Sequence, residues 1–250
     1  MATAYATLQS PTSSFELPAP NLQPSASKEL AIEDLLRALT NPDLAEIVAL
    51  TLRVTGIALM ISTIIGAPLG ALIGLAKFPG KGIVRALLYT GMGLPPVVVG
   101  LFVYMALSRS GPLGPLGWLF TPKAMIVAQT IIALPLTMGL TMTSVESISP
   151  DLKRQVVALG ATRTQAAWTI LREARVGVTA AVVAAFGGII SEVGAVLLVG
   201  GNIAGETRVL TTSIVQETRQ GDFSLALALG LILLALTFAV NTALMKLQKF

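Results

Sequence analysis

The chain has 250 residues, of which 54% are hydrophobic and 12% are charged, and its formal net charge is +4. Soluble domains carry about 25% charged residues, so this composition is typical of an integral membrane protein. The chain contains no cysteine and no histidine, which excludes disulfides and thiolate chemistry and removes the commonest general base and metal ligand.

The N-terminal region divides into two predicted segments. Residues 1–27 are rich in Ala, Pro, Ser and Thr, which predicts a disordered tail, and they lack the basic start and apolar run of a signal peptide. Residues 28–44 contain ELAIEDLLRAL, where leucine and isoleucine recur at helical spacing. This pattern predicts either an amphipathic helix at the membrane surface or a short helix packed on the bundle.

Five apolar runs are long enough to cross a hydrocarbon core of ~30 Å, which needs about 20 residues. They are 45–76, 83–107, 124–145, 176–199 and 225–244. The second run contains Pro95 and Pro96, which remove two backbone donors and predict a broken helix. Such a break either lines a transport path or is a packed kink. The sequence therefore predicts one all-α membrane domain over 45–250 with about five spans.

Two charged residues fall inside the predicted spans, Arg53 and Glu192. A charge at membrane depth costs about 3 kcal/mol on insertion scales, so each is expected to have a partner or to face water. Counting ~1.5 Å per residue along straight helices places both at comparable depths. The sequence therefore predicts an ion pair between Arg53 and Glu192 near the outer mouth.

Basic residues are distributed unequally between the two predicted sides. One side holds ten of them, and the loops on the other side hold four: Arg109, Lys123, Arg208 and Arg219. Because basic loops stay inside, the ten-charge side is predicted to be cytoplasmic, with the C-terminus inside and the N-terminus outside. The outer cations Lys123, Arg208 and Arg219 either dock a substrate-delivering protein or raise the local anion concentration.

A polar loop over 149–175 separates the third and fourth spans. Helix-favouring residues on both sides of Gly160 predict two short helices joined near that glycine. The loop is predicted to present a helix to a soluble cytoplasmic partner, and the alternative is a solvated basic loop.

Three stretches carry a family resemblance. Gly160-Ala161 followed by Ile170 resembles the coupling loop of importer-type ATP-binding-cassette (ABC) permeases, although the family's Glu-Ala-Ala is replaced by Arg154-Gln155-Val156 and its Leu-Pro by Arg172-Glu173. GLPPVVVG at 93–100 resembles the broken second span of molybdate, tungstate and sulfate permeases. SEVGA at 191–195 and GNIAGETRVLTT at 201–212 resemble the signature of that oxyanion group. The sequence of these segments is most similar to that of tungstate permeases.

The resemblance implies a type I ABC importer permease in the cytoplasmic membrane that imports a tetrahedral oxyanion, with tungstate first and molybdate or sulfate as alternatives. It implies a second copy of the chain, a cytoplasmic ATPase dimer that binds ATP and Mg, and an extracytoplasmic substrate-binding protein. The chain has no Gly-rich phosphate loop, so it is expected to be a transport subunit without a cofactor rather than an enzyme. No nucleic-acid partner is expected. The alternative from a different class is an ATP-independent secondary anion carrier.

The resemblance also assigns residues to two roles. The residues expected to engage the ATPase are Asp151, Leu159, Gly160, Ala161 and Arg163. Candidates for the pathway or gate are Pro95, Pro96, Ser191, Thr211, Thr212 and Ser213. Hydroxyls donate hydrogen bonds to an oxyanion without a counter-charge that would trap it, but these four hydroxyls are equally suited to capping helices.

Overall fold

The computed structural model describes residues 43–247, which are helical and contain no strand. The predicted tail 1–27 and most of the predicted surface helix 28–44 lie outside the described residues. The long helices are α2 (Leu44–Leu75), α5 (Pro122–Glu146) and α11 (Phe223–Leu247). The shorter ones are α3 (Lys81–Met92), α4 (Pro96–Leu107), α6 (Pro150–Ala158), α7 (Arg163–Glu173), α8 (Arg175–Ile190), α9 (Gly194–Gly200) and α10 (Leu210–Gln220), with a 3-10 turn at Gly114–Leu116.

Up to five membrane crossings fit these helices. Three helices, α2, α5 and α11, are individually long and apolar enough to span a bilayer. Two further pairs qualify together but are bent, α3 with α4 by 93° and α7 with α8 by 67°. The predicted break at Pro95 and Pro96 is thus confirmed.

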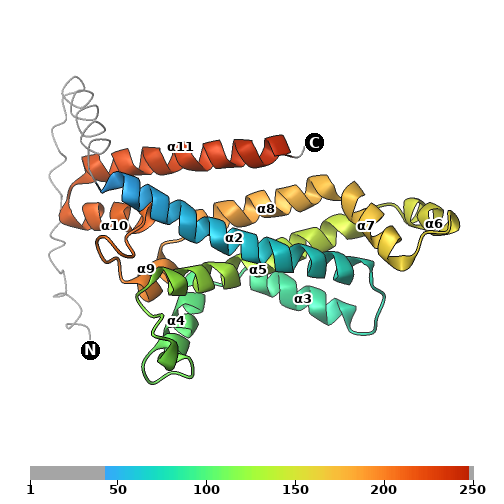
Figure 1. The fold of residues 1–250 in the computed structure, drawn as a ribbon, viewed down its shortest axis with the longest axis horizontal. Helices are drawn as coiled ribbons and strands as arrows, with labels where there is room; N and C mark the ends of the chain where they lie inside the picture. Colours follow the sequence, from blue (N-terminus) through green and yellow to red (C-terminus); the bar gives the residue numbers. More distant parts are fainter. Residues whose placement is uncertain (1–42, 248–250) are drawn as a thin grey trace, which may run out of the picture.

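Helix α5 lies at the centre of the bundle and contacts α2, α3, α4, α8 and α9 (Figure 1). Its closest neighbour is α2, whose Gly66, Gly70 and Gly74 face it. A Cβ at Gly70 would collide with the backbone carbonyl of Met138, and one at Gly74 would lie 2.9 Å from the Met142 carbonyl oxygen. The absence of side chains at these glycines therefore lets α2 and α5 pack closely.

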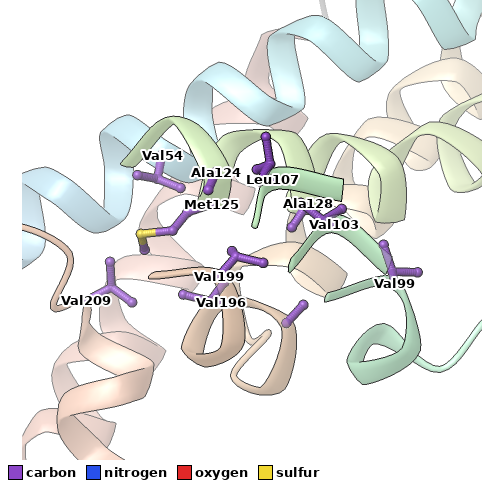
Figure 2. Close-up of a cluster of buried hydrophobic side chains, with 11 residues drawn as sticks. Val54, Val99, Val103, Leu107, Ala124, Met125, Ala128, Val196, Val199 and Val209 are labelled. Atoms are coloured by element: carbon purple, nitrogen blue, oxygen red, sulfur yellow. The ribbon is translucent and has the colours of Figure 1, made fainter. Parts of the chain in front are cut away.

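The main apolar core lies where α2, α4, α5 and α9 meet. Figure 2 shows Val54, Val103, Met125 and Val199 pointing toward one another from these four helices. All four side chains are buried, with Met125 and Val199 at 0% exposure. This core holds α4 and α9 in place, the two short helices that follow interruptions of the helical chain at residues 93–95 and 191–193.

One end of the bundle carries a charged cluster. The Glu146 carboxylate at the end of α5 lies 3.0 Å from Lys81 Nζ and 2.8 Å from a guanidinium nitrogen of Arg85. Both basic residues lie in the first part of α3. Lys81 also donates to the carbonyls of Gly74 and Ala76, which leave the last turn of α2. The cluster joins three helix ends on the side where α6 and α7 project (Figure 1).

Candidate functional site

Two interruptions of the helices, called helix breaks below, lie side by side in the bundle. The first separates α3 from α4 at residues 93–95, and the second separates α8 from α9 at residues 191–193. The first turns after the breaks are in contact, because a Cβ at Gly194 would lie 2.5 Å from Val97 Cγ2. One turn further along α4, a Cβ at Gly100 would lie 2.6 Å from the Ala195 Cα, so the backbones of α4 and α9 lie against each other there.

The first break follows from its prolines. Pro95 is extended (φ −61°, ψ 120°) and precedes α4, and Pro96 is the first residue of that helix. At the first helical position a proline loses no intrahelical hydrogen bond, so α4 restarts without penalty in a new direction.

The second break corrects the prediction of a continuous span over 176–199. Helix α8 ends at Ile190, and the Glu192 carboxylate caps α9 by accepting a hydrogen bond from the Ala195 N–H at 2.9 Å. Thr211 Oγ1 donates to the Glu192 carbonyl at 3.2 Å, and Gln129 Nε2 donates to the Ile189 carbonyl at 3.0 Å. Backbone groups that the break frees thereby gain partners, as membrane depth requires.

Gln129 was missed by the sequence reasoning. It is 4% exposed and lies in the N-terminal half of α5, an apolar helix in which a lone side-chain amide is costly unless it is hydrogen-bonded. Gln129 could have been found from the sequence because an amide among apolar residues indicates a polar partner on a neighbouring helix.

The four candidate hydroxyls fall into two groups. Ser191 is exposed at the second break, where its hydroxyl donates to the Gly187 carbonyl at 2.8 Å, so donation to an anion requires the hydroxyl to rotate away from that carbonyl. Thr212 and Ser213 are 1% and 3% exposed, and both donate to the Val209 carbonyl at 3.0 Å. They lie in α10, a separate polar helix that precedes the last span α11. Thr211 is also buried, so Ser191 is the most accessible of the four.

The predicted Arg53–Glu192 ion pair is wrong. Glu192 caps α9, whereas Arg53 lies with Trp118 and Lys123 around a cavity of about 300 Å³. In the described part of the chain, carboxylate–cation contacts join Glu146 to Lys81 and Arg85, and Asp151 to Arg154. The depth count failed because α2 has 32 residues, about 48 Å at ~1.5 Å per residue, and overhangs the hydrocarbon core.

The other outer cations are dispersed. Lys123 Nζ lies 5.6 Å from the centroid of the Trp118 ring, while Arg208 and Arg219 line two further pockets. They do not form a single basic funnel.

The polar loop forms two helices, as predicted. Helix α6 ends in a left-handed turn at Gly160 (φ +82°), where the Gly160 and Ala161 N–H groups donate to the carbonyls of Val157 and Val156. This is the Schellman arrangement, which requires a residue that tolerates positive φ. A capping box between Thr162 and Gln165 then starts α7.

The tip of this loop presents an apolar side chain to solvent. Beside Gly160, Leu159 is 87% exposed and Val157 is 62% exposed. At the start of α6, away from this tip, Asp151 forms an ion pair with Arg154 at 2.5 Å. Of the predicted coupling residues, Leu159 and Gly160 thus lie together at the loop's most exposed turn. The side chain of Arg163 is not among those described.

Helix α7 ties the loop to the bundle. Ile170 and Ala174 are each 4% exposed and pack with Ala71 of α2 and Val145 of α5. The loop is therefore joined by buried apolar contacts to the two central helices.

These features define a multi-pass membrane protein of the transporter class, with paired helix breaks in the bundle and a helical loop projecting from one end. Residues 66–249 match the family "Binding-protein-dependent transport system inner membrane component". The chain belongs to this family of ABC importer permeases, which are components of the inner membrane.

Three comparisons place the chain more closely. It is 47% identical over 203 residues to a probable anion ABC transporter permease protein of Haloferax volcanii, covering 79% of this chain and 88% of the relative. It is 41% identical over 209 residues to the tungstate uptake system permease protein of Peptoclostridium acidaminophilum, covering 84% and 92%. The solved structure of a bacterial ABC transporter that imports the acidic polysaccharide alginate has the same fold, with a TM-score of 0.71 at 19% identity over 90% and 88% of the two chains.

Proposed function

We propose that this chain is the permease of an ATP-driven importer for a tetrahedral oxyanion, with tungstate as the substrate. The observation that carries the proposal is the 41% identity to a tungstate uptake permease over 84% of the chain. A second tungstate uptake permease, from Campylobacter jejuni, is 35% identical over 69% of the chain. Permeases for molybdenum and sulfate from Escherichia coli are more distant, at 28% and 27% identity.

The transport path is expected to pass the two adjacent helix breaks. Broken helices that expose backbone groups toward a cavity recur in transporters. Ser191 lies at one break and Pro95-Pro96 at the other. The exposed hydroxyl of Ser191 would make transient contact with an oxyanion by rotating away from the Gly187 carbonyl and donating to the anion instead. A second copy of the chain would complete the path from the opposite side.

The energy is expected to enter through the α6–α7 loop. Leu159 and Val157 are apolar and exposed on a membrane protein's polar loop, where a docked protein surface would cover them. Gly160 lets that surface approach the backbone closely. The partner would be an ATPase dimer that binds ATP and Mg.

The orientation follows from the basic residues at the same end. Lys81 and Arg85 at the start of α3, with Arg154, Arg172 and Arg175 in or beside the loop, favour a cytoplasmic location for that end. The C-terminus of α11 points the same way (Figure 1), and the start of α2 would face outside, where a substrate-binding protein delivers the anion.

Reconstitution separates the ATP-driven function from a secondary carrier. The permease would be placed in liposomes with its ATPase and binding protein, and tungstate uptake would be measured with ATP or a non-hydrolysable analogue. The proposal predicts uptake only with ATP and competition by molybdate at higher concentration. Uptake that persists without ATP hydrolysis would contradict it and identify a carrier.

A further inference from the structure

A groove of about 330 Å³ lies at the elbow between α7 and α8. Its walls are Leu171, Val178 and Thr179, and its polar rim is formed by Arg172 and Arg175. Trp168 completes the groove and is 69% exposed, which is unusual for the largest apolar side chain. The groove thus combines an apolar floor, an exposed indole and two guanidinium groups.

The groove lies at the level where the hydrocarbon core ends. On α5, Lys123 and Glu146 are 23 residues apart, or about 35 Å at ~1.5 Å per residue, and so bracket a core of ~30 Å. Gly177 at the start of α8 packs directly on Ser144 of α5, which places Arg175 beside the Glu146 end. Aromatic and basic residues gather at this depth because headgroups begin there.

The two arginines are available to an anion. Neither forms an ion pair within residues 43–247, although Glu173 lies between them in sequence. They are three residues apart across the elbow, a spacing that lets both guanidinium groups reach one phosphate. Arginine binds phosphate through paired N–H donors, which makes it more selective than a single point charge.

The chain's other tryptophan supplies a contrast. Trp118 lies at the opposite boundary with Arg53 and Lys123, but Lys123 Nζ lies 5.6 Å from the centroid of its ring. That cation is therefore engaged by the aromatic face. Only the Trp168 groove offers two basic side chains with no such contact among the described residues.

We infer that the Trp168–Arg172–Arg175 groove binds the headgroup of an anionic phospholipid. The phosphate accepts hydrogen bonds from Arg172 and Arg175, the indole of Trp168 lies among the headgroups, and the upper acyl chain packs on Leu171 and Val178. The site adjoins α7, whose Ile170 packs on the central helices, so a bound lipid stiffens the elbow through which the α6–α7 loop joins the bundle. The inference requires only that the chain spans a bilayer, and it does not depend on the transported anion.

Fluorescence quenching by brominated lipids tests the inference. Trp118→Phe leaves Trp168 as the sole tryptophan of the full-length chain, which would be reconstituted with phospholipids brominated near the headgroup. Each basic residue near an anionic surface contributes roughly fivefold, so two exposed arginines together predict a preference on the order of 25-fold of Trp168 for brominated phosphatidylglycerol over brominated phosphatidylcholine. Equal quenching by the two lipids would overturn the inference.

Matched variants separate a specific site from a general surface preference. Arg172→Gln with Arg175→Gln in the Trp118→Phe background is expected to abolish the preference, and the double lysine variant to keep part of it. Trp168→Phe leaves Trp118 as the probe. The preference of Trp118 for brominated phosphatidylglycerol is expected to be at least roughly threefold weaker than that of Trp168, a difference that corresponds to the contribution of about one basic residue. A preference that survives the double Gln substitution, or is equal at both tryptophans, would overturn the assignment.

The ATPase is the competing occupant of this groove. The permease would be labelled with 5-hydroxytryptophan, which is excited apart from ordinary tryptophan, and the quenching repeated after the ATPase subunits are added. Unchanged selective quenching supports a lipid site in the assembled transporter. Loss of quenching on assembly would show that the groove is an ATPase contact and would overturn the lipid assignment.

Discussion

The side-chain nitrogen of Gln129 lies 3.0 Å from the carbonyl oxygen of Ile189, so the N-terminal half of α5 supports the end of α8 at the helix break. Gln129→Leu removes this donor at similar volume. Losing a buried hydrogen bond costs about 1–2 kcal/mol, so thermal unfolding in detergent is expected to occur several degrees lower.

Thr130→Val is the matched control for that change. The Thr130 hydroxyl is buried on the same helix and has no partner in the described residues, so its removal is expected to leave stability unchanged or slightly raised. Equal destabilisation by the two variants would contradict a specific role for Gln129.

Contact between α4 and α9 is expected to depend on Gly100. Gly100→Ala adds a Cβ 2.6 Å from the Ala195 Cα, and since that contact is with backbone, the helices must separate. Overpacking of this kind costs about 1–3 kcal/mol, and anion uptake is expected to fall with stability. Gly230→Ala, on α11 with no atom within 4 Å of the added Cβ, is the control and is expected to be stable and active. Wild-type behaviour of Gly100→Ala would contradict the adjacency of the two breaks.

The hydroxyl candidates are expected to separate into two phenotypes. Ser191→Ala removes an exposed hydroxyl at the break and is expected to slow anion uptake several-fold, by roughly one weak hydrogen bond, with the unfolding temperature unchanged. Thr212→Val removes a hydroxyl that donates to the Val209 carbonyl and accepts from the Val209 N–H, so it is expected to cost about 1 kcal/mol of stability. Unfolding and uptake measured on the same preparations distinguish the roles, and the reverse pattern would refute the assignment.

The sequence predicted the elements whose signals are local. Pro95 and Pro96 indicated the first break, and Gly160 indicated the turn between α6 and α7, because proline and glycine act on their own backbone.

The second break and the charge partners were not predictable in the same way. Residues 191–193 contain no proline, and the break is supported by Gln129 and Thr211 from other parts of the chain. Its local signal is Glu192, which caps α9 but was interpreted as half of an ion pair. The supposed partners Arg53 and Glu192 were placed by counting along straight helices, a method that fails when one helix overhangs the membrane and the other ends at Ile190.

Leu159 is expected to anchor the ATPase. Leu159→Asp places a charge at the most exposed apolar position of the loop and is expected to weaken ATPase association roughly tenfold or more, without changing the permease's own stability. Leu113→Asp, at an exposed leucine between α4 and α5 on the opposite end, is expected to leave association unchanged. Co-purification of the ATPase at graded concentrations measures this, and equal effects of the two variants would argue against docking at the α6–α7 loop.

Anion accumulation in cells tests the central claim most directly. Cells with and without this chain would be given tungstate and molybdate together at low concentration, and both metals would be measured in washed cells. The account predicts that tungsten accumulation is lost without the chain, is restored by the wild-type copy, and that molybdenum accumulation persists. Unchanged tungsten accumulation in cells that lack the chain would contradict tungstate import as its function.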